Sequence, residues 1–246
     1  MTAQYWQLSS QQAPPASGEI HVWRIDLAAA LPAPADTALL SPDERERAGR
    51  LLSEHKRARF IAGRSTLRRL LGRYLDEEPQ GLVFHYGRHG KPALVARTSS
   101  ESLTFNFSHS KNLALLAVAT DREVGIDLEY RHRNISVDSF ARHILCENET
   151  VALQRLPANR HQQALLAAWT RKEAYLKALG DGLARSLKSF SAGIAEVETA
   201  VLRLEDTKGE PVTWKFTPLA VHPDYFACLT APGSDWTPRC FDWMSL

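Results

Sequence analysis

Alternating apolar and polar residues mark several strands along the chain. The period of two is visible over residues 19–27, 103–107 and 123–130. Residues 113–119 are apolar without a break, which indicates a strand buried on both faces. Further strands are predicted in the last part of the chain, over residues 190–197, 200–204, 212–216 and 225–230.

The first helical region begins at a strong start signal. Ser41 can cap the helix, Pro42 suits its first turn, and Glu44 completes a capping box. The helical pattern then continues to about residue 75 with a break near Ser53, and the leucines of its second half form one buried stripe with the arginines at its margins.

The second half of the chain repeats this mixture of helices and strands. Short helices are predicted over residues 137–156, and a longer helix over residues 160–179 ends at Gly180. Helices followed by antiparallel strands in each half predict an α+β architecture with two similar lobes, divided near residue 120.

Composition and charge narrow the class of protein. The chain has 246 residues with 44% hydrophobic residues, a net charge of +2 and three widely spaced cysteines, which is typical of a globular protein with a real core. Its longest apolar run, residues 113–119, is far shorter than the ~20 residues that cross a bilayer. Because the first residues also lack a signal pattern, we expect a cytoplasmic protein without a membrane segment.

Basic residues concentrate in one part of the chain. Residues 41–73 contain ten Lys or Arg and four Asp or Glu. This excess is compatible with a nucleic-acid-binding helix. The interleaved acids and the small net charge of the whole chain weaken that hypothesis.

Two carboxylates are predicted to point the same way from the strand at residues 123–130. The period of two places Asp127 and Glu129 on one face together with Gly125, which leaves room for a ligand. Such hard oxygen ligands suit Mg²⁺, which binds one or two carboxylates together with phosphate and water. A solvent-facing acidic strand edge explains the same pattern.

The long helix carries a second acid in an unusual position. Glu173 and Lys177 follow Trp169 at helical spacing, in or beside the apolar stripe. An acid in a stripe that faces the core is costly unless something binds it. The alternative is an ordinary Glu–Lys pair on a solvated helix face.

Polar groups at two further places are suited to hold phosphate. Asn106, Ser108 and His109 offer hydrogen-bond donors where a strand runs into a turn. Lys91 sits on a turn before a proline, and Arg47 lies in the basic segment. Each of these features alone is common in proteins.

Together and in this order, these motifs resemble the Sfp-type 4'-phosphopantetheinyl transferases. The similar segments span most of the chain: Ser41–Arg47, Gly90–Pro92, Asn106–His109, Val124–Glu129 and Trp169–Lys177. The resemblance implies two pseudosymmetric α/β lobes, each with a small, mostly antiparallel sheet packed on helices. Residues 1–120 would form the lobe for the adenine and 3'-phosphate of coenzyme A, and residues 121–246 the lobe for Mg²⁺ and the pyrophosphate.

The resemblance also implies roles for individual residues. The metal ligands would be Asp127, Glu129 and Glu173, with Glu129 the least secure because some relatives have an apolar residue there. Lys177 and His109 would donate to the pyrophosphate, and Glu173 or a metal-bound water would be the general base. Coenzyme A would be bound by Arg47, Arg88, His89, Gly90, Lys91, Ser108, His109 and Lys177.

The implied reaction moves phosphopantetheine from coenzyme A to a serine of an apo acyl or peptidyl carrier protein, and the enzyme is expected to be a monomer. One departure concerns Glu44, where some members have a lysine, so that binding of the 3'-phosphate would depend more on Arg47, with Arg59 as a helper. The alternatives are a catalytically silent relative that binds carrier protein or coenzyme A, and the nucleic-acid-binding protein.

Overall fold

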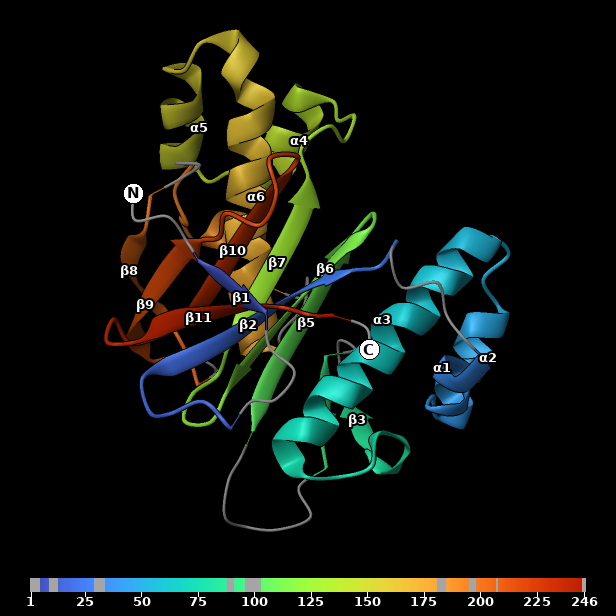
Figure 1. Cartoon of the computed structure of the whole chain (residues 1–246). Coiled ribbons are helices and arrows are strands. Elements are labelled where there is room, and N and C mark those ends of the chain that lie inside the picture. Colours follow the sequence, from blue (N-terminus) through green and yellow to red (C-terminus); the bar gives the residue numbers. More distant parts are fainter. Residues whose placement is uncertain are drawn as a thin grey trace.

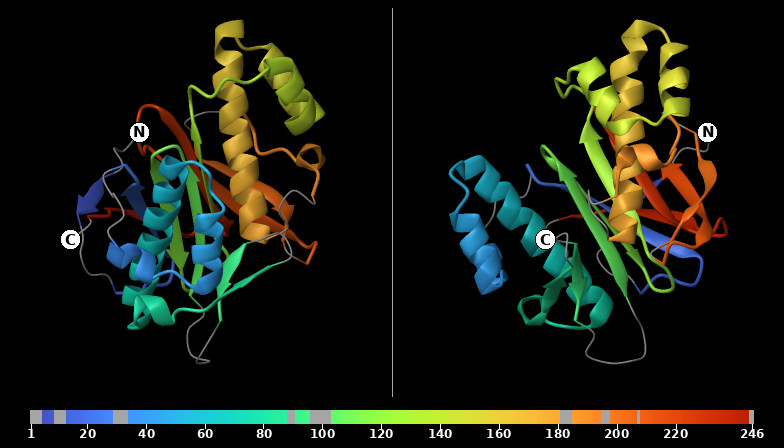
Figure 2. Two further views of the ribbon diagram at one scale, coloured as in Figure 1. Left: turned by 90° about the vertical axis from the view of Figure 1, so that its right-hand side faces the viewer. Right: turned by 180° about the vertical axis from the view of Figure 1, so that it is seen from behind.

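Two sheets pack face to face and a long helix covers each outer face (Figures 1 and 2). The computed structural model describes residues 5–8, 13–28, 34–87, 91–95, 103–180, 185–194, 198–206 and 208–244. The first sheet has the order β1-β11-β2-β6-β5 and the second the order β7-β10-β9-β8. This arrangement confirms the predicted α+β class.

The first sheet is built from both ends of the chain. Its strands are β1 (Trp6–Leu8), β2 (Glu19–Asp26), β5 (Thr104–Ser110), β6 (Leu113–Ala119) and β11 (Thr237–Asp242). Strand β11 pairs in parallel with both β1 and β2, whereas the other two pairings are antiparallel. The sheet is therefore mixed rather than mostly antiparallel, and its β11 comes from the half of the chain after residue 120. The division at that residue remains a prediction.

The second sheet is antiparallel throughout. Its strands are β7 (Gly125–Tyr130), β8 (Ala200–Glu205), β9 (Pro211–Pro218) and β10 (Tyr225–Pro232). Apolar side chains of β7 on one face, Ile126 and Leu128, enter the core between the two sheets, as the alternation predicts. The opposite face of β7 meets helix α6 (His161–Leu179).

The helix pair in the first half follows the predicted signals. Helix α2 (Pro42–Gly49) begins after Ser41, whose backbone N–H donates to the Glu44 carboxylate over 3.0 Å. After a break, the Ser53 hydroxyl accepts from a backbone N–H at the start of α3 (Glu54–Leu75). The expectation that Arg68 lies at the margin of the stripe is wrong. Arg68 is 1% exposed, because its Nε donates to Glu44 over 2.7 Å.

The remaining elements are short. They are α1 (Pro34–Ala38), the hairpin β3 (Phe84–Tyr86) and β4 (Pro92–Leu94), α4 (Val137–Ile144) and α5 (Glu147–Gln154). None of the described helices is long and apolar enough to cross a membrane.

The predicted strand over residues 190–197 is wrong for its described part, residues 190–194. A 3-10 turn, Leu187–Ser189, precedes it, and two cations of α6 hold the segment as an irregular loop. Lys172, which is fully buried, donates to the carbonyls of Leu187 and Phe190, and Arg171 donates to that of Ala192. These backbone oxygens are thus satisfied by side chains instead of by a neighbouring strand.

Buried His21 makes the fold sensitive to acid. Its Nδ1 lies 2.8 Å from the Tyr74 hydroxyl, which also accepts from Trp23 Nε1 over 2.7 Å. Burial, and secondarily the charge of Arg239, lowers the pKa of His21 from 6.5 to about 4. Its contribution to stability is therefore complete above pH 6.5 and is lost as the pH falls toward 4.

We expect the free energy of unfolding to drop by about 2 kcal/mol between pH 7 and pH 5 through His21 alone, since one pKa unit corresponds to about 1.4 kcal/mol. Urea titrations at the two pH values measure this drop. The variant His21→Gln should lose less stability on acidification, whereas His143→Gln, at an exposed position, should behave as the wild type. Parallel pH curves for all three proteins would contradict the assignment.

Candidate functional site

Close packing of α6 on β7 creates the candidate site. A Cβ atom at Gly125 would overlap the Ala174 carbonyl oxygen and would lie 2.7 Å from the Ala178 backbone nitrogen. The expectation that Gly125 leaves room for a ligand is therefore wrong: the missing side chain leaves room for the helix. This approach places Glu173 and Lys177 beside the carboxylates of β7.

Asp127 lies at the centre of a small polar cluster. Its Oδ1 accepts from Lys177 Nζ over 2.5 Å and from the Ser108 hydroxyl over 2.9 Å. Lys177 Nζ also donates to Ser108 Oγ over 2.9 Å, which closes a triangle among the three side chains. Asp127 is only 5% exposed, and its second oxygen, Oδ2, is buried without a hydrogen-bond partner among the described residues.

Glu129 points to the same side of β7 and is held by two donors. Its Oε1 accepts from Trp169 Nε1 over 3.0 Å and from Arg133 Nη1 over 3.1 Å. Burial, followed by the charge of Asp127, raises the pKa of Glu129. Sequence reasoning assigned Trp169 to the apolar stripe and missed this hydrogen bond. Trp169 lies four residues before Glu173 on α6. This spacing places both side chains on one helix face and is the sequence signal that Trp169 also faces the carboxylates of β7.

Glu173 has the most strongly raised pKa of the carboxylates in the cluster. Burial raises its pKa to about 7, and the charges of Asp127 and Glu129 add to this effect while Lys177 opposes it. Its Oε1 is buried and has no partner within the described part of the chain. The alternative interpretation was an ordinary pair between Glu173 and Lys177 on a solvated helix face. It is ruled out because Lys177 bonds to Asp127.

Strand β5 presents its polar side chains in two directions. Asn106 and Ser108, 4% and 5% exposed, face β7, where Asn106 Oδ1 accepts from the Ile126 N–H over 3.0 Å. The expectation of an exposed strand end is wrong for these two residues, because β5 runs on to Ser110. His109 points to the other face, and burial, then the charges of Lys177 and Arg64, lowers its pKa.

The remaining predicted residues lie away from this cluster or outside the described residues. Arg47 lies on α2 with its guanidinium 5.4 Å from the centre of the Phe60 ring. Lys91 Nζ donates to Glu123 and to the Ala178 carbonyl, each over 3.0 Å, and so ties the β3–β4 hairpin to the end of α6. Arg88, His89 and Gly90 are not among the described residues.

The cluster offers partial ligation for a divalent cation. No three His, Cys, Asp or Glu side chains converge into a complete metal-binding group within the described ranges. Two buried carboxylate oxygens, Asp127 Oδ2 and Glu173 Oε1, nevertheless lack hydrogen-bond partners among the residues that the structure describes. Mutual repulsion also helps to raise the pKa values of Glu129 and Glu173. A hard cation would relieve this repulsion and satisfy both oxygens, so these residues fit Mg²⁺.

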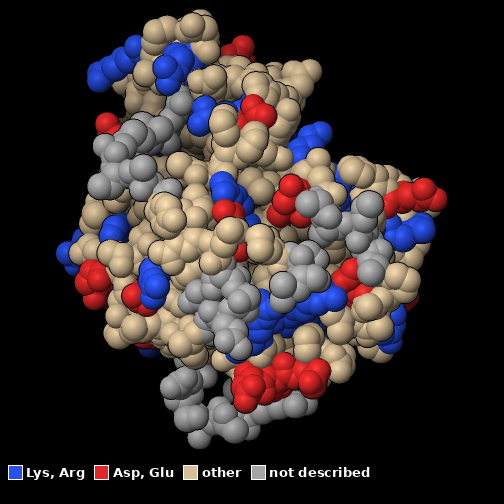
Figure 3. Space-filling view, in the orientation of Figure 1, with Lys and Arg blue, Asp and Glu red and all other residues tan. Residues whose placement is uncertain are grey.

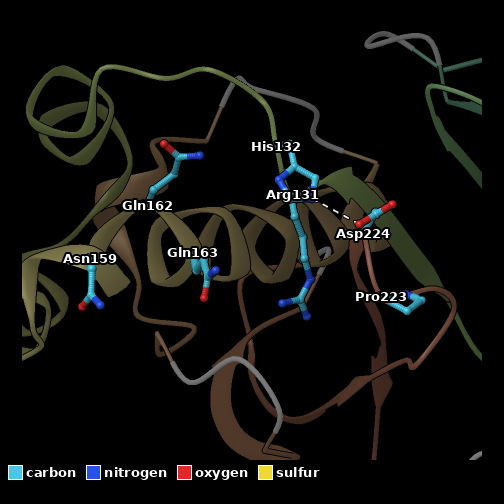
Figure 4. A pocket seen from close by; sticks show the side chains of 7 residues that line it. All are labelled: Arg131, His132, Asn159, Gln162, Gln163, Pro223 and Asp224. Carbon is cyan, nitrogen blue, oxygen red and sulfur yellow. Dashed lines mark hydrogen bonds and ion pairs between the residues drawn. The ribbon is translucent and has the colours of Figure 1, made fainter.

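Two surface hollows lie outside this cluster. One, of about 420 Å³, is lined by residues of α6 and of the turns after β7 and before β10, and in it His132 Nε2 contacts Asp224 over 3.1 Å (Figure 4). A larger one, of about 1040 Å³, lies beside β9, β10 and β11. None of the predicted site residues lines either hollow.

Comparison with known proteins agrees with the geometry. Residues 123–230 match the family model "4'-phosphopantetheinyl transferase superfamily", and residues 34–121 match "4'-phosphopantetheinyl transferase, N-terminal". The 4'-phosphopantetheinyl transferase HetI of Nostoc sp. is 39% identical over 225 residues, which cover 91% of this chain and 92% of that protein. A putative 4'-phosphopantetheinyl transferase of Synechocystis sp. is 37% identical over 154 residues, 63% of this chain and 62% of the relative.

A solved structure, described as an apo-ACPS structure from "Chronobacterium ammoiniagenes", matches 45% of this chain and 95% of its own with 17% identity and a TM-score of 0.24. The sequence matches extend over both halves of the chain and include every element that builds the carboxylate cluster. The chain belongs to the 4'-phosphopantetheinyl transferase family.

Proposed function

We propose that this protein transfers the 4'-phosphopantetheine group of coenzyme A to a serine of an apo acyl or peptidyl carrier protein, with Mg²⁺ bound at the carboxylate cluster. The observation that carries the proposal is the pair of buried, unpartnered oxygens on Asp127 and Glu173, beside the ammonium group of Lys177. Such a set can hold a cation and an anionic phosphate side by side.

The reaction is a phosphoryl transfer that ends in a new serine phosphodiester. The serine oxygen attacks the β-phosphorus, a bond forms between them, and the bond from that phosphorus to the bridging oxygen breaks. Adenosine 3',5'-bisphosphate leaves with the electron pair of that bond. Mg²⁺, held by Asp127, Glu129 and Glu173, would supply charge neutralisation for the pyrophosphate.

The side chains of α6 and β5 perform the remaining tasks. Lys177, 29% exposed, is placed to donate to a pyrophosphate oxygen while it stays paired with Asp127. His109 would be a second donor, although its side chain leaves the face of β5 opposite to that of Ser108. Glu173 would take the proton of the serine hydroxyl, directly or through a water molecule.

The two halves of the chain would share the binding of coenzyme A. We place the adenine and the 3'-phosphate on the side of residues 1–120, with Arg47 and residues 88–91, and the pyrophosphate on the side of residues 121–246. Glu44 takes no part in this binding, because it is 2% exposed and bonded to Arg68. The buried bond to Arg68 explains why position 44 is an acid in this chain, where some relatives have a lysine.

The test is intact-protein mass spectrometry of an apo carrier protein after incubation with this protein and coenzyme A. We expect a mass gain of one phosphopantetheine that disappears when EDTA replaces Mg²⁺. A panel of acyl and peptidyl carriers would identify the preferred acceptor. No gain on any carrier, from a protein shown to be folded, would instead indicate a silent relative.

Ion pairs of arginines in residues 41–73 argue against the hypothesis of a nucleic-acid-binding protein. Arg68 is buried against Glu44, Arg69 is paired with Asp36, and Arg50 is paired with Glu46. Figure 3 shows one band of basic side chains at the lower centre of this face, with a patch of acidic side chains directly below it. These three ion pairs neutralise part of the positive charge of the segment, which weakens the case for binding to a phosphate backbone.

A further inference from the structure

Arg64, on α3, presents a hydrogen-bond donor that no described residue satisfies. Its side chain is 13% exposed, and its Nη1 is buried without a partner among the described residues. The closest acid, Glu44, has its Oε1 3.9 Å from Arg64 Nε, too far for a hydrogen bond, and its Oε2 is bonded to Arg68. A buried donor without an acceptor is costly, and a ligand that accepts from Arg64 would remove this cost.

A second guanidinium lies on the same aromatic ring. Arg47 and Arg64 approach the Phe60 ring with their guanidinium carbons 5.4 and 5.8 Å from its centre. Within the described residues Arg47 makes no ion pair at all, and Arg64 has only the distant contact to Glu44. Two guanidinium groups beside one ring are chemically suited to an anion that carries two charges, such as a phosphate monoester.

The position of Arg64 connects this ring to the carboxylate cluster. Burial raises the pKa of the exposed Tyr86 phenol on the β3–β4 hairpin; the charges of Arg64 and Arg47 oppose this effect, and those of Glu44 and Asp43 add to it. The charges of Lys177 and Arg64 both lower the pKa of His109, after its burial. Arg64 therefore lies near enough to Tyr86 and His109 to influence both, and Lys177, which is bonded to Asp127, acts on the same histidine.

We infer that Arg64 is a specificity-determining residue that donates, together with Arg47, to the 3'-phosphate of coenzyme A. The inference rests on the proposed function, since it takes coenzyme A as the ligand. A phosphate monoester provides the doubly charged anion that the two guanidinium groups fit. The pyrophosphate would instead lie near Lys177, which is bonded to Asp127.

The experiment measures the affinity of the full chain for coenzyme A and for 3'-dephospho-coenzyme A by isothermal titration calorimetry, without a carrier protein. Arg64→Met removes the guanidinium and keeps an aliphatic stem against Phe60. Arg50→Met removes one charge from a neighbouring exposed position and is the matched control. Arg64→Lys keeps the charge and loses the fork, and it serves as the second variant if the methionine variant is unfolded.

We expect the wild type and Arg50→Met to bind coenzyme A more tightly than its dephospho form. Arg64→Met should lose affinity for coenzyme A by roughly ten- to a hundredfold, the usual loss for a hydrogen bond to a charged group, and change affinity for the dephospho form less than about twofold. Arg64→Lys should show an intermediate loss.

Three results would overturn the inference. If the folded Arg64 variants keep the wild-type preference, or lose affinity for both ligands equally, Arg64 does not contact the 3'-phosphate, while the proposed function stands. If the folded wild type binds neither ligand, the proposed function itself fails and the role of Arg64 fails with it.

Discussion

Asp127→Ala is expected to lower the rate of phosphopantetheine transfer by roughly a thousandfold or more, about 4 kcal/mol of transition-state stabilisation. Asp127 is the point at which the proposed cation, Lys177 and Ser108 meet. The fold should persist, because Lys177 is 29% exposed and can still donate to Ser108 when its carboxylate partner is removed. Steady-state transfer to a carrier, combined with thermal unfolding, measures both effects.

Glu129→Ala is the matched control for this prediction, since it removes another carboxylate from the same face of β7. Glu129 is already engaged by Trp169 and Arg133, so water can replace its contribution to a cation, and measurable activity should remain. Equal loss in the two variants would show that both carboxylates are needed. Full activity of a folded Asp127→Ala protein would exclude the proposed metal ligation.

The carboxylate cluster was predictable from the sequence because it depends on two local periods. The period of two in β7 aligns Asp127 with Glu129, and helical spacing aligns Trp169, Glu173 and Lys177. What the sequence could not supply is the contact between the two elements. Gly125 decides it, because any side chain there would push α6 away, and a glycine in a strand is equally compatible with an approaching ligand.

Long-range pairing accounts for the features that sequence reasoning missed. Strand β11 lies more than two hundred residues from β2 in the chain and joins it in parallel, which no local pattern reveals. Lys172 and Arg68 look like surface cations in a helical pattern, yet both are buried because Glu149 and Glu44, from other helices, pair with them. The sequence predicted the elements, while their partners depended on the packed fold.

The substitution Glu173→Gln should have opposite effects on activity and on stability. Transfer should fall by about a hundredfold or more, because the amide can neither accept the serine proton nor bind a cation as a carboxylate does. In EDTA at pH 8, however, the variant should be more stable than the wild type by about 2 kcal/mol, after allowance for partial exposure of the group. A neutral side chain removes the buried charge that Asp127 and Glu129 repel.

The raised pKa of Glu173 determines how the difference in stability between Glu173→Gln and the wild type changes with pH. The pKa of Glu173 is raised from 4.5 to about 7 in the folded protein, so the wild type keeps the stability of the protonated form below pH 4.5 and loses it as the pH rises to 7. The stability difference between Glu173→Gln and the wild type should therefore grow between pH 4.5 and 7 and stay constant above it. Glu210→Gln, at an exposed position, should show no such difference.

Mg²⁺ should reverse the order of stability. A cation that binds only the folded wild type stabilises it by mass action, whereas the glutamine variant loses one ligand and should gain less. Urea titrations at pH 8 with EDTA and with millimolar Mg²⁺ separate the two contributions. If Glu173→Gln were less stable than the wild type in EDTA, the carboxylate would be a structural group. In that case no bound cation would be needed to explain why Glu173 lies in a buried stripe of α6.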